Sequence, residues 1–456
     1  MEYNDFLQTK RHTSINYGID YDFMPNKMFD FQKYVTDHAI KKGREAVFLD
    51  TGLGKTIIEL TVAKNYIHAT NKPVLIITPL AVAFQHLKEA EKFGIDDIMY
   101  SKDGKYNTKI VLCNYERLDK FDHNDFECVI LDESSILKNF DGAIKNQVTA
   151  FLKKIKYRFL FTATPSPNDF IELGTSSEAL GYMGHTDMLT KFFTNNEDTI
   201  KPQNIGTKWI LKGHAKEDFF KWVSSWSISM RKPSDLGFND DRFMLPELIK
   251  HFHSVKNKKN MAVNGQVKLF NDIARSLIEV RAEQRLTIED RCQKAIELAN
   301  NYDTSVYWCN LNDEGDLLNS LDKSAYQIKG SMNIDRKEEL LLAFASGEIK
   351  KLITKAKMTG FGLNWQHCNH TVFFPTFSFE QYYQAIRRFW RFGQKDKVVC
   401  DIVYSDGQKR VLDSLLAKTD KANELFSKLN SSINSNYSVK KSEFNNKISL
   451  PKFINS

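Results

Sequence analysis

The stretch FLDTGLGKT, residues 48–56, ends like a phosphate-binding loop. The general pattern is G-x-x-x-x-G-K-S/T, and its closing Gly-Lys-Thr is present, although Leu49 stands where the first glycine belongs. The apolar run AVFL precedes this stretch, and IIELTVAKNYIHA follows it with helical spacing. A strand, a glycine turn and a helix suit a phosphate loop, because amide N–H groups at a helix N-terminus bind anions. A solvated turn is the alternative that this segment alone leaves open.

In such a loop, each polar residue has a distinct expected task. Gly52 and Gly54 would let backbone amides close on the phosphates of ATP. Lys55 would reach the β- and γ-phosphates, and Thr56 would hold Mg²⁺. The expected cofactors are therefore ATP and Mg²⁺.

Short apolar runs alternate with helical patterns around this loop. The runs are four to seven residues long, rich in β-branched or aromatic residues, and include PVLIIT, KIVLC, CVIL, RFLFT, SVYWCN, KKLIT, HTVFF and VVCDIVY. Strands that are apolar on both faces and alternate with helices predict parallel sheets covered by helices, an α/β fold. Residues 174–247 break this rhythm. We therefore expect a first α/β domain at 1–173, a helical insertion or linker at 174–247, a second α/β domain at 248–429 and a polar, disordered tail at 430–456.

Bulk composition agrees with two domains. A chain of 456 residues exceeds what one hydrophobic core usually holds, and 42% hydrophobic with 27% charged residues is typical of globular proteins. The formal charge of +7 is compatible with a nucleic-acid partner without requiring one. The six cysteines include no C-x-x-C pair, so we expect a reducing compartment and neither a zinc site nor a disulfide framework. The N-terminus lacks a signal-peptide core, and no run approaches the ~20 apolar residues of a membrane span.

The segment VILDESS, residues 129–135, is the second chemistry-bearing element. An apolar strand ending in two acids suits a metal-bound phosphate site, because Asp132 can hold Mg²⁺ and Glu133 can deprotonate an attacking water. Strands also end in Asp-Glu for solubility alone. The pairing with the upstream Gly-Lys-Thr strengthens the catalytic interpretation.

Two further segments complete the set. In RFLFTATP, a strand runs into the hydroxyls of Thr162 and Thr164, although Pro165 can simply end that strand. In QAIRRFWRFGQ, helical spacing would place Gln384, Arg388 and Arg391 on one face. Arginines aimed at a transferring phosphoryl group stabilise its charge, whereas a basic surface helix is the plainer alternative.

These segments occur in the order Gly-Lys-Thr, Asp-Glu, Thr-Ala-Thr and Gln-x-x-x-Arg-x-x-Arg. That order, together with the run Gly-Phe-Gly-Leu-Asn at residues 360–364, resembles the superfamily-two helicases and translocases, and within them the Swi/Snf-like branch. The resemblance implies two RecA-like domains with ATP bound between them. It also implies an ATP-dependent DNA helicase or translocase that hydrolyses ATP to move along or remodel duplex DNA.

The resemblance implies roles for further residues. Gln32 is similar to the glutamine that reads adenine, and Leu53 and Gly362 are similar to other nucleotide-site residues. Ser135, Thr162, Thr164 and Gln384 are similar to residues that couple hydrolysis to movement. The residues similar to nucleic-acid contacts are Thr78, Pro79, Tyr115, Asn310, Thr354, Lys355 and Asn364.

The sequence departs from the family's usual motifs in two places, and these departures bear on which type of family member it resembles. The usual Asp-Glu-Ala-His is Asp-Glu-Ser-Ser here, so Ser135 stands where the histidine would link the acids to Thr-Ala-Thr. Met358 and Thr359 replace the usual Gly-Gly of a later loop. No histone-reading modules are visible, and the chain resembles compact phage or bacterial members related to the DEAD/DEAH-box proteins. We therefore expect the cytoplasm of a bacterial or phage-infected cell and no membrane partner.

Three alternatives remain open at this point. The chain could be an RNA helicase, since its motifs do not read the 2′-hydroxyl. It could be the motor subunit of a nuclease, methylase or replication complex, with protein partners in replication, recombination or restriction. It could also be a nucleotide-gated clamp with little turnover, although a water-activating Glu133 would then have no use.

Overall fold

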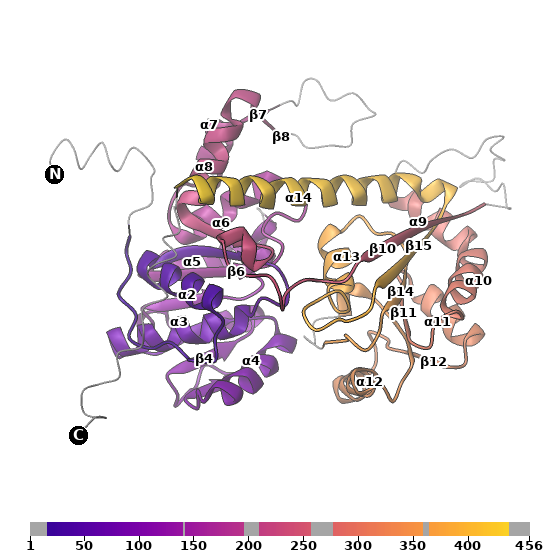
Figure 1. Cartoon of the computed structure of the whole chain (residues 1–456), viewed down its shortest axis with the longest axis horizontal. Coiled ribbons are helices and arrows are strands. Elements are labelled where there is room, and N and C mark those ends of the chain that lie inside the picture. The colour runs from indigo at the N-terminus through magenta and orange to yellow at the C-terminus, as the bar shows by residue number, and fades with distance from the viewer. Residues whose placement is uncertain (1–15, 140–141, 196–208, 257–276, 359–363, 437–456) are drawn as a thin grey trace.

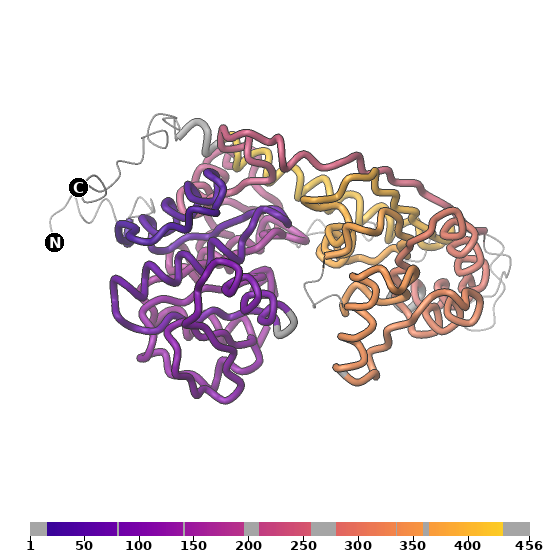
Figure 2. The backbone as a smooth tube through the Cα atoms, turned by 60° about the horizontal axis from the view of Figure 1, so that its bottom comes forward, coloured from indigo at the N-terminus to yellow at the C-terminus, as the bar shows by residue number. Residues whose placement is uncertain are grey.

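The computed structural model describes residues 16–139, 142–195, 209–256, 277–358 and 364–436. They form two lobes side by side, each built on a parallel sheet with helices packed on both faces (Figure 1, Figure 2). This confirms the predicted α/β fold with two RecA-like domains. Among the described helices, none is long and apolar enough to cross a membrane.

The sheet of the first lobe has seven strands in the order β3-β4-β2-β5-β6-β1-β9. Its strands are β1 (Arg44–Leu49), β2 (Val74–Ile77), β3 (Ile98–Tyr100), β4 (Ile110–Cys113), β5 (Cys128–Leu131), β6 (Tyr157–Thr162) and β9 (Ser227–Met230). Every pairing is parallel. Strands β2, β4, β5 and β6 are buried along their whole length, as continuous apolar runs require when both faces are covered.

Helices cover both faces of this sheet. They are α2 (Asp30–Lys42), α3 (Lys55–Thr70), α4 (Leu80–Phe93), α5 (Ala143–Leu152), α6 (Leu173–Leu180), α7 (His185–Phe192) and α8 (Lys216–Trp226). The predicted insertion at 174–247 contains most of the last three. It also contains an antiparallel pair, β7 (Phe193–Asn195) with β8 (Trp209–Leu211), and strand β9, which pairs with β1. This segment is thus less purely helical than expected, because β9 extends the main sheet.

The second lobe has six parallel strands in the order β10-β15-β14-β11-β13-β12. They are β10 (Leu248–Val255), β11 (Ser305–Trp308), β12 (Ala325–Gln327), β13 (Lys351–Thr354), β14 (His370–Phe373) and β15 (Val398–Ser405). The helices around them are α9 (Leu277–Leu286), α10 (Ile288–Ala299), α11 (Asn312–Leu321), α12 (Ile334–Ser346) and α13 (Phe379–Ile386). The carboxyl ends of parallel strands are where such sheets bind ligands, which directs attention to the loops after β1, β5 and β13.

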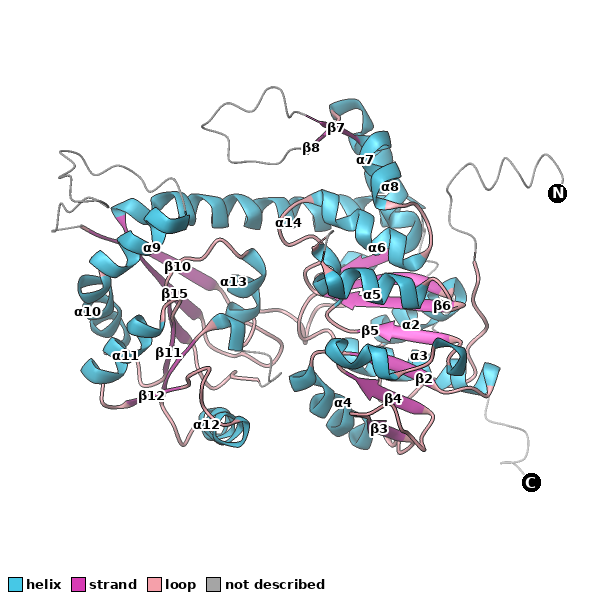
Figure 3. Ribbon diagram, turned by 180° about the vertical axis from the view of Figure 1, so that it is seen from behind, coloured by secondary structure: helices cyan, strands magenta, loops and turns pink. Residues whose placement is uncertain are grey.

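One long helix, α14 (Lys409–Asn436), ties the lobes together. It follows β15 of the second lobe and runs across both lobes (Figure 1, Figure 3). Its far half joins the first lobe's core through Leu425, Phe426 and Leu429. Residues 430–436 of the predicted tail are therefore helical, and 437–456 lie outside the described residues.

The docking of α14 gives a stability prediction. Leu429 is fully buried in the core of the first lobe, so Leu429→Ala leaves a cavity and should lower the free energy of unfolding by about 2–5 kcal/mol. Urea denaturation followed by tryptophan fluorescence measures the loss. Lys428→Ala, at an exposed neighbour, serves as the control and should change little. Equal stability of both variants would mean that this end of α14 does not dock.

Candidate active site

The glycine turn after β1 has the backbone that a phosphate loop requires. Gly52 and Gly54 have φ angles of +88° and +84°, which other residues adopt only with strain. A Cβ at Gly54 would lie 2.2 Å from Nε2 of Gln32, and one at Gly52 would lie 3.3 Å from Cβ of Phe392 in the second lobe. Helix α3 then begins at Lys55, whose Nζ donates to the carbonyl of Leu49 at 3.1 Å. Space and conformation both exclude a side chain from this turn.

The side chain of Gln32 hydrogen-bonds to the backbone of the glycine turn. It lies on α2, and its Nε2 donates to the carbonyl of Leu53 at 3.0 Å. Its Oε1 accepts from the backbone N–H of Phe29 at 3.0 Å. The amide thus joins the helix start to the phosphate turn and lies beside the predicted nucleotide site.

Asp132, directly after β5, is the buried centre of the acid cluster. The hydroxyl of Thr78 donates to its Oδ2 at 3.1 Å, and the hydroxyl of Tyr115 donates to its carbonyl at 2.6 Å. Both were expected along a nucleic-acid track, but both are buried against Asp132. Because β4, β2 and β5 are adjacent in the sheet, the residues that follow these strands meet at one edge.

The two acids have raised pKa values. Burial and then the charge of Glu59 raise the pKa of Asp132 to about 6, while His86 and Lys55 act in the opposite direction. Burial and then the charge of Asp132 raise the pKa of Glu133 to about 7, while Lys55 and Arg388 lower it. These influences show that Lys55 and Arg388, from different lobes, lie within electrostatic reach of the same glutamate.

A second, fully buried pair supports Asp132. Nε2 of His86, on α4, lies 2.7 Å from Oε2 of Glu59 on α3 and 3.9 Å from Oδ2 of Asp132. This pair was not predicted from the sequence. Glu59 lies four residues after Lys55 on the same helix, and that spacing was the available signal.

The second lobe presents its arginines differently from the prediction. Helix α13 ends at Ile386, so Gln384, Arg388 and Arg391 do not share one helical face. The chain instead forms tight turns, in which the N–H of Arg388 reaches the carbonyl of Ala385, and Trp365 holds the Arg388 carbonyl at 3.0 Å. Gln384 is half-buried on α13. The arginines nevertheless face the first lobe, since Cβ of Arg391 lies 3.9 Å from a Cβ built on Gly52.

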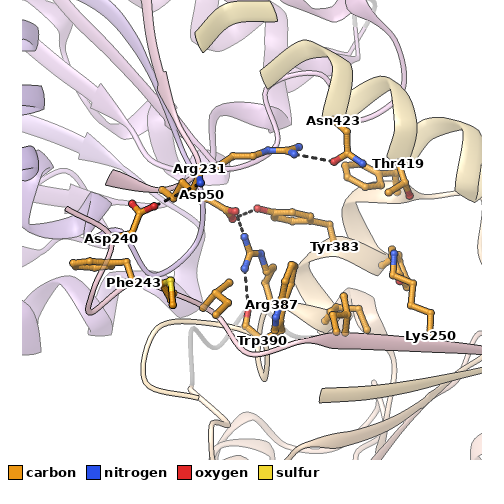
Figure 4. A pocket seen from close by; sticks show the side chains of 17 residues that line it. Asp50, Arg231, Asp240, Phe243, Lys250, Tyr383, Arg387, Trp390, Thr419 and Asn423 are labelled. Atoms are coloured by element: carbon orange, nitrogen blue, oxygen red, sulfur yellow. Dashed lines mark hydrogen bonds and ion pairs between the residues drawn. The ribbon is translucent and has the colours of Figure 1, made fainter. Parts of the chain in front are cut away.

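A buried ion pair joins the lobes beside the phosphate turn. Arg387 pairs with Asp50, and the hydroxyl of Tyr383 donates to the same carboxylate (Figure 4). Nη1 of Arg387 also donates to the carbonyl of Trp390 at 2.9 Å, and its guanidinium lies 4.5 Å from that indole ring. Burial lowers the pKa of Arg387 to about 9, which still leaves the guanidinium charged at neutral pH. Asp50, Tyr383 and Arg387 were not among the residues predicted from the sequence.

A second contact between the lobes involves Ser135. Its hydroxyl donates to Oε1 of Glu380 on α13 at 2.6 Å, and Lys138 pairs with the other oxygen of that carboxylate. Ser135 was expected to connect with Thr162 and Thr164. Those two residues are buried, and the N–H of Thr164 donates to the Thr162 hydroxyl at 3.0 Å. The serine hydroxyl therefore binds the second lobe rather than the Thr-Ala-Thr segment that was expected.

Most of the remaining predicted residues, those expected to contact nucleic acid, lie in the second lobe. Nδ2 of Asn310 donates to the carbonyl of Pro375 at 2.9 Å, and Nζ of Lys355 donates to Oδ1 of Asn312 at 2.7 Å. Thr354 is buried, whereas Asn364 is exposed. A hollow of about 300 Å³ is lined by Thr354 and Lys355. Pro79 is half-buried in the first lobe, Thr56 lies in the first turn of α3, and Gly362 falls outside the described residues.

A cavity of about 490 Å³ opens between the lobes beside the ion pair. It is lined by both charged and aromatic side chains, including Asp50, Arg231, Phe243, Tyr383 and Arg387 (Figure 4). Phe243 stacks on Phe392 with ring centroids 4.8 Å apart. The site is thus assembled from both lobes.

Two family models match parts of the chain. Residues 26–167 match the model described as type III restriction enzyme, res subunit, and residues 285–393 match the helicase conserved C-terminal domain. The kind and order of these two matches agree with the resemblance to superfamily-two helicases of the Swi/Snf-like branch. Its helicase domains imply the use of a nucleotide.

Curated relatives agree with this branch. The SWI/SNF-related matrix-associated actin-dependent regulator of chromatin subfamily A-like protein 1 of Xenopus tropicalis is 26% identical over 166 residues, covering 34% of this chain and 17% of that protein. The DNA annealing helicase and endonuclease ZRANB3 of Bos taurus is 29% identical over 181 residues, covering 35% of this chain and 17% of that protein. The match thus spans only 17% of the length of each relative.

A solved structure was also compared, the Sulfolobus solfataricus SWI2/SNF2 ATPase core in complex with dsDNA. It aligns with 17% identity and a TM-score of 0.43, covering 90% of this chain and 98% of that one.

The Asp50–Arg387 pair gives a prediction about the joined lobes. Arg387→Ala leaves a buried carboxylate without its partner, and breaking such a pair costs about 3–5 kcal/mol. We expect the two lobes to open on the side of the glycine turn while α14 still joins them, with a larger radius of gyration in solution scattering. Arg387→Lys keeps the charge and should restore part of the compact form. Identical scattering from Arg387→Ala and the unaltered protein would contradict this.

Proposed function

We propose that this chain is an ATP-driven motor that moves along or remodels double-stranded DNA. One observation carries the proposal: the glycine turn that precedes Lys55 in the first lobe lies directly against Arg391 and Phe392 of the second lobe. A site divided between two lobes is made complete by closure and opened again afterwards, which is how hydrolysis can be converted into movement.

Each residue then has a proposed task. Lys55 would hold the phosphates of ATP, whose adenine would lie beside Gln32. Glu133 would orient the attacking water and take its proton, a task suited to a carboxylate with a pKa near 7. Arg388 and Arg391 would stabilise the charge that develops on the transferring phosphoryl group.

The acid cluster also fits Mg²⁺. A hard cation prefers oxygen ligands, and Asp132 offers a buried carboxylate within electrostatic reach of Lys55, the residue before Thr56. When bound, Mg²⁺ would neutralise phosphate charge during hydrolysis. Thr78 would orient the carboxylate of Asp132 through its hydrogen bond.

The contact between Ser135 and Glu380 suggests how the lobes communicate. Ser135 and Lys138 follow the catalytic acids closely, while Glu380 lies on the helix that leads to the arginines. A movement of Asp132 and Glu133 during hydrolysis would therefore be transmitted to α13 through these bonds. We assign the coupling role to this contact, with Thr162 and Thr164 supporting it inside the first lobe.

Nucleic acid would lie across both lobes and be held by its phosphates. Lys355, which directly follows β13, and the exposed Asn364 would contribute contacts to those phosphates. The relative from Bos taurus is named a DNA annealing helicase, which supports DNA over RNA. The match to a restriction-enzyme subunit supports a second candidate, in which this chain is the motor of a restriction complex. A bacterial or phage origin stays a prediction.

The experiment that tests this function is an ATPase assay with double-stranded DNA, single-stranded DNA and RNA side by side. We expect the largest stimulation from double-stranded DNA, weakening as salt rises because phosphate contacts release counterions. Stimulation by RNA alone would overturn the DNA assignment. Turnover that appears only with a nuclease or methylase subunit present would favour the restriction-complex candidate.

The catalytic assignments predict three inactive variants. Lys55→Ala, Glu133→Gln and Arg391→Ala should each abolish hydrolysis, because each removes a group proposed to act on the phosphates or the water. Circular dichroism should show an intact fold. The exposed residues Lys88 and Lys395 provide the matched controls Lys88→Ala and Lys395→Ala. Near-normal turnover in any catalytic variant would remove that residue from its task.

The coupling assignment predicts a different defect. Glu380→Gln keeps the side-chain shape but loses charge-assisted bonds worth about 1.5–3 kcal/mol, so DNA stimulation of hydrolysis should fall by about tenfold or more. Binding of ATP should change little, because Glu380 is not assigned to the nucleotide. Glu338→Gln, at an exposed residue of the same lobe, is the control. Normal DNA stimulation in Glu380→Gln would exclude a coupling role.

A further inference from the structure

Three histidines surround one buried aspartate in the second lobe, within the sheet and outside the proposed active site. Asp401 lies on β15 and is 4% exposed. Nδ1 of His251 and Nε2 of His253, both on the edge strand β10, lie 3.1 Å and 2.8 Å from its Oδ1. Side chains two residues apart on a strand share a face, and His251 is paired with Asp401 in the sheet register. The His-Phe-His run of β10 therefore places both imidazoles over one carboxylate oxygen.

The other carboxylate oxygen of Asp401, Oδ2, contacts a buried histidine on the neighbouring strand β14. Nε2 of the buried His370 lies 2.9 Å from Oδ2, and Nδ1 of the same ring lies 2.8 Å from the hydroxyl of Ser305. The ring of Tyr302 stacks on His370 with centroids 3.8 Å apart. The carboxylate is thus fixed in orientation by a buried layer, as carboxylates that bind metals usually are.

We propose that His251, His253 and Asp401 form a binding site for a divalent transition metal of the zinc class. The three ligand atoms all lie within 4.8 Å of one another. Zinc bonds of about 2.0–2.2 Å imply ligand separations of roughly 3.3 Å in a tetrahedral site, so small side-chain adjustments would admit the ion. In the described residues, one other group of histidine and acidic side chains has a similar spacing, and it is wholly buried; the group of His251, His253 and Asp401 reaches solvent.

The mixed ligand set decides which metal would bind. Two imidazoles and one carboxylate suit zinc, cobalt, nickel or copper, whereas magnesium and calcium prefer oxygen ligands throughout. His251 is 53% exposed, so an ion could enter from solvent and keep water as a fourth ligand. No cysteine takes part, which explains why cysteine spacing gave no sign of this site. The ion would tie the edge strand β10 to β15.

Cobalt is a suitable probe, because tetrahedral Co²⁺ has strong visible d–d absorption. Tag-free full-length protein, treated with chelator and kept in excess Mg²⁺ to occupy oxygen-ligand sites, would be titrated with Co²⁺. The six described cysteines are all buried, which limits thiolate binding. We expect one equivalent of Co²⁺ to bind, and Zn²⁺ to displace it. His251→Gln and His253→Gln should each weaken binding by tenfold or more.

The control is His214→Gln, at an exposed histidine of the first lobe, which should bind Co²⁺ normally. His251 is more than half exposed, so its replacement should leave the fold intact even if His253→Gln does not fold. Thermal unfolding should also shift upward with Zn²⁺ in the unaltered protein and not in His251→Gln. Absence of d–d absorption in the unaltered protein, or equal titration of His251→Gln, would overturn the proposal.

Discussion

The ion pair between Asp50 and Arg387 is the interaction on which the joined form of this molecule depends. Asp50 comes directly after the strand that leads to the phosphate turn, and it is buried. A buried carboxylate without a partner is costly, so Asp50 favours any arrangement in which Arg387 reaches it. When the pair forms, Phe392 lies against Gly52 and the arginines of the second lobe face the glycine turn. The placement of the second lobe's arginines thus depends on Arg387 neutralising the charge of Asp50 in the first lobe.

The other side of the molecule is joined by a different kind of contact. There α14 inserts Leu425, Phe426 and Leu429 into the core of the first lobe, an apolar contact with no charged group to exchange. The contacts beside the phosphate turn are mainly ionic, between Asp50 and Arg387 and between Glu380 and Lys138. Ionic partners can be exchanged for phosphate or metal, whereas a buried apolar contact has no such replacement. The chemistry thus favours rotation about the α14 side over full separation of the lobes.

The sequence was enough to predict the two parallel sheets and the acids beside the glycine turn. Apolar runs of strand length and a loop with fixed glycine spacing are local signals, and both depend on backbone geometry that few other sequences satisfy. It was not enough to predict how Arg388 is presented. Helical spacing continued past Ile386 in the sequence, but the helix ends there, and the N–H of Trp365 binds the Arg388 carbonyl just beyond it, a contact that depends on tertiary packing.

Contacts between distant segments were missed for the same reason. Glu380 and Ser135 are 245 residues apart, and Asp50 and Tyr383 are 333 apart, so no local pattern connects them. Thr78 and Tyr115 were expected along the nucleic-acid track because they resemble the family's nucleic-acid contacts. The strand order brings them to Asp132 instead, and strand order is a property of the sheet rather than of either segment.

The charges around Asp132 show why Glu59 and His86 are needed. Complete burial works against a charged imidazole, but the hydrogen bond and charge of Glu59, with help from Asp132, raise the pKa of His86 to about 9. The imidazole is therefore positive at neutral pH and balances Glu59. That leaves Asp132 and Glu133 to face Lys55, with Arg388 of the second lobe also acting on Glu133. Because His86 balances Glu59, the negative charge that raises the pKa of Asp132 is partly offset, which favours the carboxylate form that the proposed Mg²⁺ site requires.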